Sequence, residues 1–426
     1  MSDAHKKLFE MGLDSIKNLE VDLGLLASSK TEVYGCVFGR DSLISSLELL
    51  EAYERTHDEY FLHLVRKVLR GLSNLQGREV VLESGEEPGK IIHEYRPEGH
   101  EHLTKAAVNP WYVYPDNVMR NYDSVDSTPL FLMTAHRYLE VSGDEVFIAE
   151  LRPSLQAALQ WITEYAAPQP GEFIRYRFHP DRKYGGLKSQ SWMDSAESLF
   201  YEESTAFPAY PIAPVEVQAY AFASLLAWSD YFLKSDKTLA KDLHERAVAL
   251  KAAFNKSYVF VHGKRVTLAF ALDGANIPLK AARSSMGHVL FAAHKTKNGP
   301  ECILESQYIE RVRERLLARD LFVPSAGIRT LSSRSLHYDP LSYHNGSIWP
   351  HDTAMLAQGL RNFGYVEDAA RVERALIKAY AHFNTPIELF GYSRGFKQYA
   401  HPDGAPACQV QAWSAASLVA LLGEGA

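Results

Sequence analysis

The chain has 426 residues, of which 46% are hydrophobic, and 45 Lys and Arg stand against 52 Asp and Glu for a formal net charge of −7. This mildly acidic balance argues against a nucleic-acid partner, because nucleic-acid binding needs a basic face. The apolar content and the 23% charged residues exclude a disordered chain. Three widely spaced cysteines, Cys36, Cys302 and Cys408, encode neither a disulfide framework nor a cysteine-based zinc site.

The first residues read as an amphipathic segment, and no apolar run approaches the roughly 18 residues that a membrane span needs. We therefore expect a soluble, cytoplasmic protein with no membrane contact. Aromatic residues make up 12% of the chain, and the 23 Tyr outnumber the 20 Phe. Rings that combine an apolar face with a hydrogen-bonding edge are typical of sugar clefts and of protein interfaces.

Helical periodicity recurs along the whole chain, whereas the period-2 alternation of strands is scarce. No linker or low-complexity stretch divides the sequence, so we expect residues 1–426 to form a single domain. The periodicity predicts twelve helices, at residues 4–19, 40–54, 58–75, 126–141, 152–166, 214–233, 236–254, 284–294, 304–318, 350–363, 366–382 and 408–422.

The predicted helices alternate in character along this series. The odd-numbered helices carry one charged face, and the even-numbered ones are apolar on most sides, as at residues 219–228 and 412–421. Outer helices that alternate with buried inner helices describe six helical hairpins, so the pattern predicts an all-α fold, a single (α/α)6 toroid. A helical solenoid would also alternate, but it would show a fixed sequence repeat, and we find none.

The connections between the helices also alternate, in length. Residues 77–125 and 167–213 contain no convincing helix, whereas the connections that follow the inner helices are short, as at Thr56–Asp58. Long loops in a compact domain are usually functional. We therefore expect the active site at the N-terminal ends of the inner helices, lined by the two long loops.

The sequence contains no phosphate-binding loop, no His-Glu-x-x-His zinc motif and no Gly-x-Ser-x-Gly motif, and we expect no cofactor. Instead, clusters of polar and aromatic residues precede the inner helices. Carboxylates beside aromatic rings are typical of glycoside hydrolysis, in which one carboxyl donates a proton and another activates water. The clusters are Phe38–Asp41, Asn121–Ser127, Ser191–Ser195, Pro214–Gln218, Tyr343–Asp352 and Pro386–Phe390.

Several of these residues also have a purely structural interpretation. Asp41 and Asp126 stand where helix N-caps and first-turn acids occur, and Arg40 beside Asp41 is equally explained as half of a structural ion pair. Glu216 follows a proline at a helix start, which is again a favoured place for a carboxylate. The indole of Trp192 and the ring of Tyr122 belong to the same clusters, and we include both among the candidate sugar contacts.

Asp194 and Glu388 differ from these carboxylates because they lie in loops where no helix needs capping. The adjacent Trp192 would desolvate Asp194 and raise its pKa, as a general acid requires. Glu197, in the same loop, is the competing candidate for the acid. We expect no metal, because the spacing of the loop histidines His93, His100 and His102 matches no known ligand set.

The ordered set of motifs resembles the amylo-α-1,6-glucosidase domain of glycogen-debranching enzymes, within the six-hairpin (α/α)6 glycosidases. The resemblance runs from about residue 35 to residue 420. The motifs are Phe38-Gly-Arg-Asp-Ser-Leu43, Ser191-Trp-Met-Asp194, Pro214-Val-Glu-Val-Gln-Ala219, Tyr343-His-Asn-Gly-Ser-Ile-Trp-Pro350 and Glu388-Leu-Phe390.

The resemblance implies hydrolysis of a glycosidic bond with inversion, without metal or cofactor. Asp194 would be the general acid and Glu388 the general base. Arg40 and Asp41 would hold the hydroxyls of the sugar being transferred, and His344, Asn345 and Trp349 would form another wall of the site. An α-linked glucoside is the substrate that follows most directly from this family.

Two departures from the debranching pattern leave other substrates open. We expect no further region before the predicted toroid. Pro-Ile also stands before Glu388, where a proline directly before the glutamate is typical. A small glycoside or glycosylated metabolite, of the sucrose, trehalose, glucosylglycerate or mannosylglycerate type, is therefore the alternative. An epimerase using His344 and His351, a sugar-binding protein without activity and a protein-interaction toroid are further alternatives.

Overall fold

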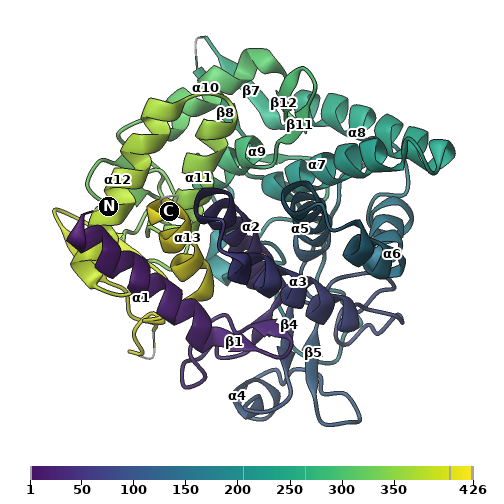
Figure 1. Cartoon of the computed structure of the whole chain (residues 1–426), viewed down its shortest axis with the longest axis horizontal. Helices are drawn as coiled ribbons and strands as arrows, with labels where there is room; N and C mark the ends of the chain where they lie inside the picture. Colours follow the sequence, from purple (N-terminus) through teal and green to yellow (C-terminus); the bar gives the residue numbers. More distant parts are fainter. Residues whose placement is uncertain (1, 205, 264, 403, 424–426) are drawn as a thin grey trace. The chain divides into compact units, whose positions relative to one another are not determined.

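The computed structural model describes residues 2–204, 206–263, 265–402 and 404–423, and most of its secondary structure is helical (Figure 1). Within these ranges, no helix has the length and apolar character needed to cross a membrane. The helices are α1 (Asp3–Leu19), α2 (Gly39–Thr56), α3 (Glu59–Asn74), α4 (Glu101–Thr104), α5 (Ser127–Ser142), α6 (Glu145–Gln160), α7 (Val215–Phe232), α8 (Lys237–Tyr258), α9 (His288–Phe291), α10 (Ser306–Leu316), α11 (Pro350–Asn362), α12 (Val366–Phe383) and α13 (Ala412–Leu422).

The chain divides into two compact units. Unit 1 comprises Met1–Ala166, Tyr176–Asp194 and Val410–Ala426, and unit 2 comprises Ala167–Arg175 and Ser195–Gln409. In unit 1, α2 packs against α3, α5 and α13, and α1 packs on α13. In unit 2, α7 packs against α8 and α9, and α11 packs against α9 and α12. The expectation of a single domain stays a prediction.

Short antiparallel strands connect the helices. Two sheets have three strands, in the orders β3-β4-β5 and β10-β9-β6, and the others are two-stranded. The strands are β1 (Glu20–Val21), β2 (Gly24–Leu25), β3 (Val37–Phe38), β4 (Glu94–Arg96), β5 (Met119–Asn121), β6 (Ala213–Pro214), β7 (Val259–His262), β8 (Arg265–Leu268), β9 (Ala271–Leu272), β10 (Pro278–Leu279), β11 (His294–Thr296), β12 (Gly299–Glu301), β13 (Phe322–Val323), β14 (Gly327–Ile328), β15 (Phe390–Tyr392) and β16 (Phe396–Gln398).

The predicted alternation of inner and outer helices is visible in their burial. The apolar helices α7 and α13 are buried along nearly their whole length. The charged helices α8 and α12 bury only a stripe of residues, such as Leu243 and Phe254 in α8. A helix that is apolar on most sides has no face suited to water, so it is buried on all sides.

Four predicted helices differ from the observed ones by three residues or more. The helix predicted at 236–254 continues to Tyr258 as α8. Helix α6 begins at Glu145 rather than residue 152, because Asp144 caps it by accepting a hydrogen bond from the Phe147 backbone at 3.0 Å. Pro153 lies inside this helix, and the chain continues as a π-helix over Trp161–Ala166. The helix predicted at 284–294 is shorter, a 3-10 turn at Ser284–Gly287 followed by α9. Helix α13 begins at Ala412 rather than residue 408.

The two long loops contain short elements that periodicity did not reveal. The first contains β4, α4 and β5, and the second contains a 3-10 turn at Ala196–Ser198. Within unit 1, Asp123 of the first loop accepts hydrogen bonds from residues of the second. Both of its carboxylate oxygens accept from Arg182 Nη1, at 2.7 and 2.9 Å, and one also accepts from the backbone N–H of Leu187 at 3.0 Å. The Asp123 and Arg182 side chains are only 2% and 3% exposed, so this is a buried ion pair.

Replacing Asp123 by alanine leaves the Arg182 guanidinium buried without its anion. We expect Asp123→Ala to lower the free energy of unfolding by about 3–5 kcal/mol, the usual cost of breaking a buried ion pair from one side. Denaturant unfolding and limited proteolysis of residues 176–190 measure the effect. Asp181→Ala is the control, because that side chain is 83% exposed. Equal stability of the two variants would contradict the role given to Asp123.

Candidate functional site

The first part of the candidate site is built at the entrance to α2. Strand β3 leads directly into this helix, and Phe38 lies opposite Glu94 of β4, which lies opposite Asn121 of β5. One small sheet therefore carries both the segment before Arg40 and the segment before Asp126. Gly39 is required at the junction, since a Cβ there would lie 2.0 Å from the Ile92 carbonyl oxygen. The chain thus enters α2 with Arg40 and Asp41 in its buried first turn.

The Arg40 guanidinium binds two carboxylates of unit 1. Its Nη1 donates to Asp126 Oδ2 at 3.2 Å, and its Nη2 donates to Asp194 Oδ2 at 2.7 Å. Arg40 and Asp126 are buried, whereas the Asp194 side chain keeps 22% of its surface exposed. The structure therefore brings together three of the predicted site residues, each from a different segment. Arg40 pairs with these two carboxylates, whereas the ion-pair interpretation had considered Asp41.

Asp126 occupies the N-cap position of α5, but its side chain does not cap the helix. Its Oδ1 accepts a hydrogen bond from Ser124 Oγ at 2.5 Å, and the Ser124 oxygen accepts the backbone N–H of Ser127 at 3.2 Å. The serine thus takes the place of the aspartate as the cap, which leaves the Asp126 carboxylate facing Arg40. The structural interpretation of Asp126 as a helix cap is therefore wrong.

Burial sets the protonation of the two other carboxyls in this cluster. It raises the pKa of Asp194 above the usual range, and the negative charge of Asp126 adds to the effect while Arg40 opposes it. Burial raises the pKa of Asp41 to about 7, again opposed by Arg40 and helped by the charges of Asp194 and Asp126. One guanidinium cannot neutralise three carboxylates, so part of the cluster holds protons near neutral pH.

The aromatic candidates of unit 1 are packed inside it. Tyr122 and Trp192 are buried, and the Tyr122 hydroxyl donates to the Leu75 carbonyl at 2.9 Å. Sequence reasoning expected both rings to contact a sugar. In this structure both rings are buried inside unit 1, close in sequence to Asp126 and Asp194.

The second part of the candidate site lies in unit 2, around Glu388. This carboxylate is buried, and it accepts hydrogen bonds from the Tyr343 hydroxyl at 2.5 Å and from the Cys408 backbone N–H at 2.9 Å. Both partners are donors, so both oxygens of Glu388 act as acceptors, which is how an ionised carboxylate bonds. Cys408 was predicted to begin a helix, but it pairs with Glu388 instead, and α13 begins at Ala412.

His344, Asn345 and Trp349 are brought together beside Tyr343. The rings of His344 and Trp349 stack with centroids 5.1 Å apart, and the Trp349 indole N–H donates to the Tyr343 carbonyl at 2.9 Å. All three side chains are buried. His344 Nδ1 lies 2.7 Å from the Ser195 hydroxyl, and the Asn345 amide donates to the Glu197 carbonyl at 2.8 Å.

Arg283 is the main residue of this region that sequence reasoning missed. It is buried, and its guanidinium donates to the His344 carbonyl at 3.0 Å, the Asn345 side-chain oxygen at 2.6 Å and the Ser198 carbonyl at 2.7 Å. Burial lowers its pKa to about 9, and the charge of Glu216 opposes this. Arg283 stands at the start of an inner helical segment, and Arg40 also lies at a helix start, so this position could have pointed to Arg283.

The remaining carboxylates before inner helices of unit 2 have different surroundings. Glu216 is buried in the first turn of α7, within electrostatic range of Arg283. Asp352 is fully buried and accepts from His288 Nε2 at 2.7 Å, and His288 Nδ1 lies 2.5 Å from the Tyr220 hydroxyl. This chain of side chains links α11, α9 and α7.

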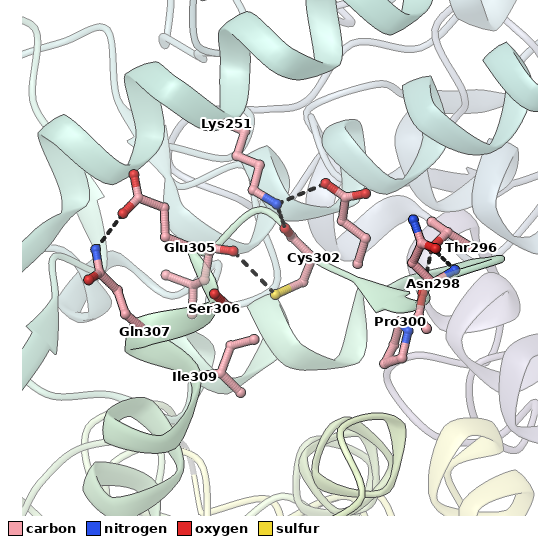
Figure 2. A pocket seen from close by; sticks show the side chains of 12 residues that line it. Lys251, Thr296, Asn298, Pro300, Cys302, Glu305, Ser306, Gln307 and Ile309 are labelled. Atoms are coloured by element: carbon pink, nitrogen blue, oxygen red, sulfur yellow. Dashed lines mark hydrogen bonds and ion pairs between the residues drawn. The ribbon is translucent and has the colours of Figure 1, made fainter.

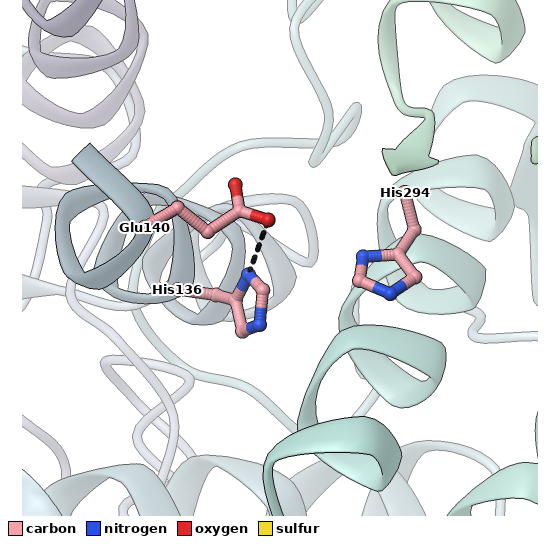
Figure 3. A group of neighbouring side chains, drawn as sticks. All are labelled: His136, Glu140 and His294. Atoms are coloured by element: carbon pink, nitrogen blue, oxygen red, sulfur yellow. Dashed lines mark ion pairs between the residues drawn. The ribbon is translucent and has the colours of Figure 1, made fainter. Parts of the chain in front are cut away.

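The histidines of the first long loop have protein partners or are buried. The His100 ring nitrogens lie 3.0 Å from Thr104 Oγ1 and 3.0 Å from the Asn117 carbonyl. Burial lowers the pKa of His93 well below its usual value, and the charges of Arg40 and Lys90 add to this effect. Elsewhere, His136 and Glu140 form an i,i+4 ion pair at 3.8 Å on α5 (Figure 3). His294 Nε2 lies 2.9 Å from the Asp230 carboxylate.

Each unit also contains a cavity. One, of about 570 Å³, is bounded by α8, the β11–β12 hairpin and the start of α10, and Lys251 donates there to Glu301 at 2.9 Å and to the Cys302 carbonyl at 2.8 Å (Figure 2). The other, of about 680 Å³, lies in unit 1 between the β1–β2 turn and the segment around Arg96. Among the residues described as lining them, neither cavity includes a predicted site residue.

The chain matches the family model of the mannosylglycerate hydrolase MGH1-like glycoside hydrolase domain over residues 112–411. This range is well over half of the chain and contains Asp126, Asp194 and Glu388. No curated protein matched the sequence. The motif resemblance to six-hairpin glycosidases is thus confirmed, while the finer match to amylo-α-1,6-glucosidase domains stays a prediction.

Several solved structures are similar to the model. The family 63 mannosylglycerate hydrolase from Thermus thermophilus, in complex with Tris, has 14% identity and a TM-score of 0.63 and covers 97% of this chain and 99% of its own. The same hydrolase with Tris and D-glycerate gives 13% identity, a TM-score of 0.63 and the same coverage. A glycosidase variant in complex with glucose has 13% identity and a TM-score of 0.59, with 99% and 97% coverage. These likenesses confirm the predicted all-α, (α/α)6 fold class.

The pKa of Asp41 predicts how stability depends on pH. The folded-state value of about 7 exceeds the ordinary 3.8, so between these values the folded state keeps a proton that the unfolded state has released. The contribution of Asp41 is therefore fully present below about pH 4 and is lost as the pH rises through 7. The loss is at most about 4 kcal/mol, the equivalent of roughly three pH units.

Asp41→Asn should remove this dependence. We expect the free energy of unfolding of the variant, relative to wild type, to increase from pH 4 to pH 8 when both are measured by denaturant titration. The comparison cancels the other titrating groups, which the two proteins share. A difference that stays constant over this range would contradict the environment described for Asp41.

Proposed function

Because the chain belongs to the family of mannosylglycerate hydrolase MGH1-like domains and is therefore a glycoside hydrolase, we propose that it hydrolyses the α-glycosidic bond of a small glycosylated metabolite, with inversion at the anomeric carbon. The observation that carries the substrate class is the family match together with the similar hydrolase structure that holds D-glycerate. A short hydroxy acid that carries a glucosyl or mannosyl group agrees with both the family match and the similar structure.

Debranching of an α-1,6-linked glucan is the second candidate, as an amylo-1,6-glucosidase-like activity. It is favoured by the ordered motifs that begin with Phe38-Gly-Arg-Asp41 and end with Glu388-Leu-Phe390. Both candidates use the same hydrolytic chemistry. They differ in the leaving group, which is a small metabolite in one case and a glucan chain in the other.

Asp194 is the proposed general acid. A proton donor must still hold its proton at the working pH, and burial raises the pKa of this carboxyl above its usual range. The side chain also keeps part of its surface exposed, so a substrate oxygen can approach it. The proton of Asp194 passes to the glycosidic oxygen as the bond to the anomeric carbon breaks. Arg40 holds the carboxyl in place through Oδ2.

Glu388 is the proposed general base. Its two oxygens accept hydrogen bonds from Tyr343 and Cys408, which supports the ionised form that a base requires. Glu388 takes a proton from a water molecule, whose oxygen attacks the anomeric carbon from the face opposite the leaving group. An α-glycoside thus yields a β-sugar. Arg40, Asp41, His344, Asn345 and Trp349 are the proposed contacts of the sugar ring or the supports of such contacts.

The stereochemistry of the product tests the reaction. We expect activity on a panel containing glucosylglycerate, mannosylglycerate, sucrose, trehalose, isomaltose and a limit dextrin to be highest on one of the glycosylated acids. Proton NMR during the first minutes should show the β-anomer formed first from an α-substrate. An α-anomer formed first would contradict inversion, and a preference for the limit dextrin would favour the debranching candidate.

Two isosteric variants test the carboxyls themselves. We expect Asp194→Asn and Glu388→Gln to lower kcat by about 10² to 10⁴-fold, the usual contribution of general acid–base catalysis, while thermal melts stay close to wild type. Glu197→Gln is the matched control, since Glu197 lies three residues from Asp194 in an exposed position. The Asp194→Asn variant should keep more of its rate on the corresponding glycosyl fluoride, which leaves without a proton. If Glu197→Gln is the inactive variant, the acid is misassigned.

A further inference from the structure

The hydrogen bond between Tyr343 and Glu388 is short and lies in a buried setting. The Tyr343 hydroxyl donates to Glu388 Oε1 at 2.5 Å, and only 1% of the Glu388 surface is exposed. A hydrogen bond to an ionised acceptor is stronger than one between neutral groups, and a low-dielectric surrounding strengthens it further. This contact therefore has a larger effect on Glu388 than an exposed hydrogen bond would have.

Tyr343 is itself held at its backbone and at its ring. Its carbonyl accepts hydrogen bonds from the Trp349 indole at 2.9 Å and from Ser347 Oγ at 2.6 Å. Its ring meets the Trp349 ring edge-on with centroids 4.9 Å apart, and the Tyr399 and His401 rings lie at 5.4 and 5.5 Å. The hydroxyl is therefore presented from a fixed position.

The backbone on the Glu388 side is fixed as well. The Glu388 backbone N–H donates to the Cys408 carbonyl at 2.9 Å, and the Cys408 N–H donates to Glu388 Oε2 at 2.9 Å. Two residues further on, Phe390 and Ile348 exchange backbone hydrogen bonds at 3.0 and 2.8 Å. The segment that carries Tyr343 is thus paired with the segment that carries Glu388.

We propose that Tyr343 is a positioning residue for Glu388. It holds Oε1 by its hydroxyl while the Cys408 N–H holds Oε2, so the carboxylate has one orientation and stays ionised at lower pH than it would without the phenol. This inference rests on the proposed function, because it assigns Tyr343 to the base of that reaction. It concerns the orientation and charge of Glu388, and Tyr343 needs no contact with the sugar for this role.

The test is the pH dependence of turnover in Tyr343→Phe, which removes the hydroxyl and keeps the ring. We expect kcat to fall about 10- to 100-fold, as for loss of a hydrogen bond to a charged group, with KM changed less than about threefold. The acid limb of the kcat/KM profile should move to higher pH by about one unit. The matched control is Tyr392→Phe, which removes a hydroxyl from strand β15 that is bonded to Ser325 Oγ at 2.7 Å, and it should behave as wild type.

A second substitution keeps the proposal testable if the phenylalanine variant folds poorly. Replacing Tyr343 by 3-fluorotyrosine makes the hydroxyl a stronger donor without changing the fold, and the acid limb should then move to lower pH. A purely structural role would change the melting temperature and leave both limbs where they are. If the limbs of the kcat/KM–pH profile stay at the wild-type pH in both variants, the proposal is overturned.

Glu388→Gln separates failure of this inference from failure of the proposed function. If Glu388→Gln is inactive while Tyr343→Phe has the same kcat and pH profile as Tyr392→Phe, Glu388 remains the base and the role of Tyr343 is wrong. If Glu388→Gln keeps the wild-type rate, Glu388 is not the base, and the positioning role is overturned together with that assignment.

Discussion

The guanidinium of Arg40 is the interaction on which the candidate site of unit 1 depends. It joins the first turn of α2 to Asp126 before α5 and to Asp194 at the end of the second long loop, over sequence separations of 86 and 154 residues. A buried cation of this kind is costly unless carboxylates surround it, and surplus carboxylates are costly unless some of them are protonated. The same arrangement that stabilises three distant segments therefore also leaves proton-holding carboxyls in the site.

Unit 2 uses a second buried guanidinium in a different way. Arg283 donates to the carbonyls of His344 and Ser198 and to the Asn345 amide oxygen, so it fixes backbone as well as side chains. Glu388 accepts hydrogen bonds from the Tyr343 hydroxyl and from the Cys408 backbone N–H. The two proposed catalytic carboxyls thus have opposite environments, one that favours the proton and one that favours the charge, as acid and base chemistry at one pH requires.

Much of the fold could be predicted because it depends on local periodicity. Helices α7 and α13 are apolar on nearly all sides, which identified them as buried. The start of α6 was predicted at residue 152, whereas Asp144 caps the helix and Pro153 lies inside it. Cys408 was assigned to a helix because its pairing with Glu388 is a tertiary contact without local pattern. The bond of Arg40 to Asp126 could not be predicted for the same reason, whereas Arg283 and Arg40 both stand at the start of an inner helical segment.

The most direct test of the account is a crystal structure of the Asp194→Asn variant with an intact glycosylated acid bound. We predict that residue 194 and Glu388 lie on opposite sides of the scissile bond, with their carboxamide and carboxyl carbons about 6.5–9.5 Å apart and a water molecule bound to Glu388. A separation of about 5 Å, with no room for water, would indicate a retaining enzyme. Substrate bound away from residue 194 or from Glu388 would contradict the assignment of these residues as acid and base.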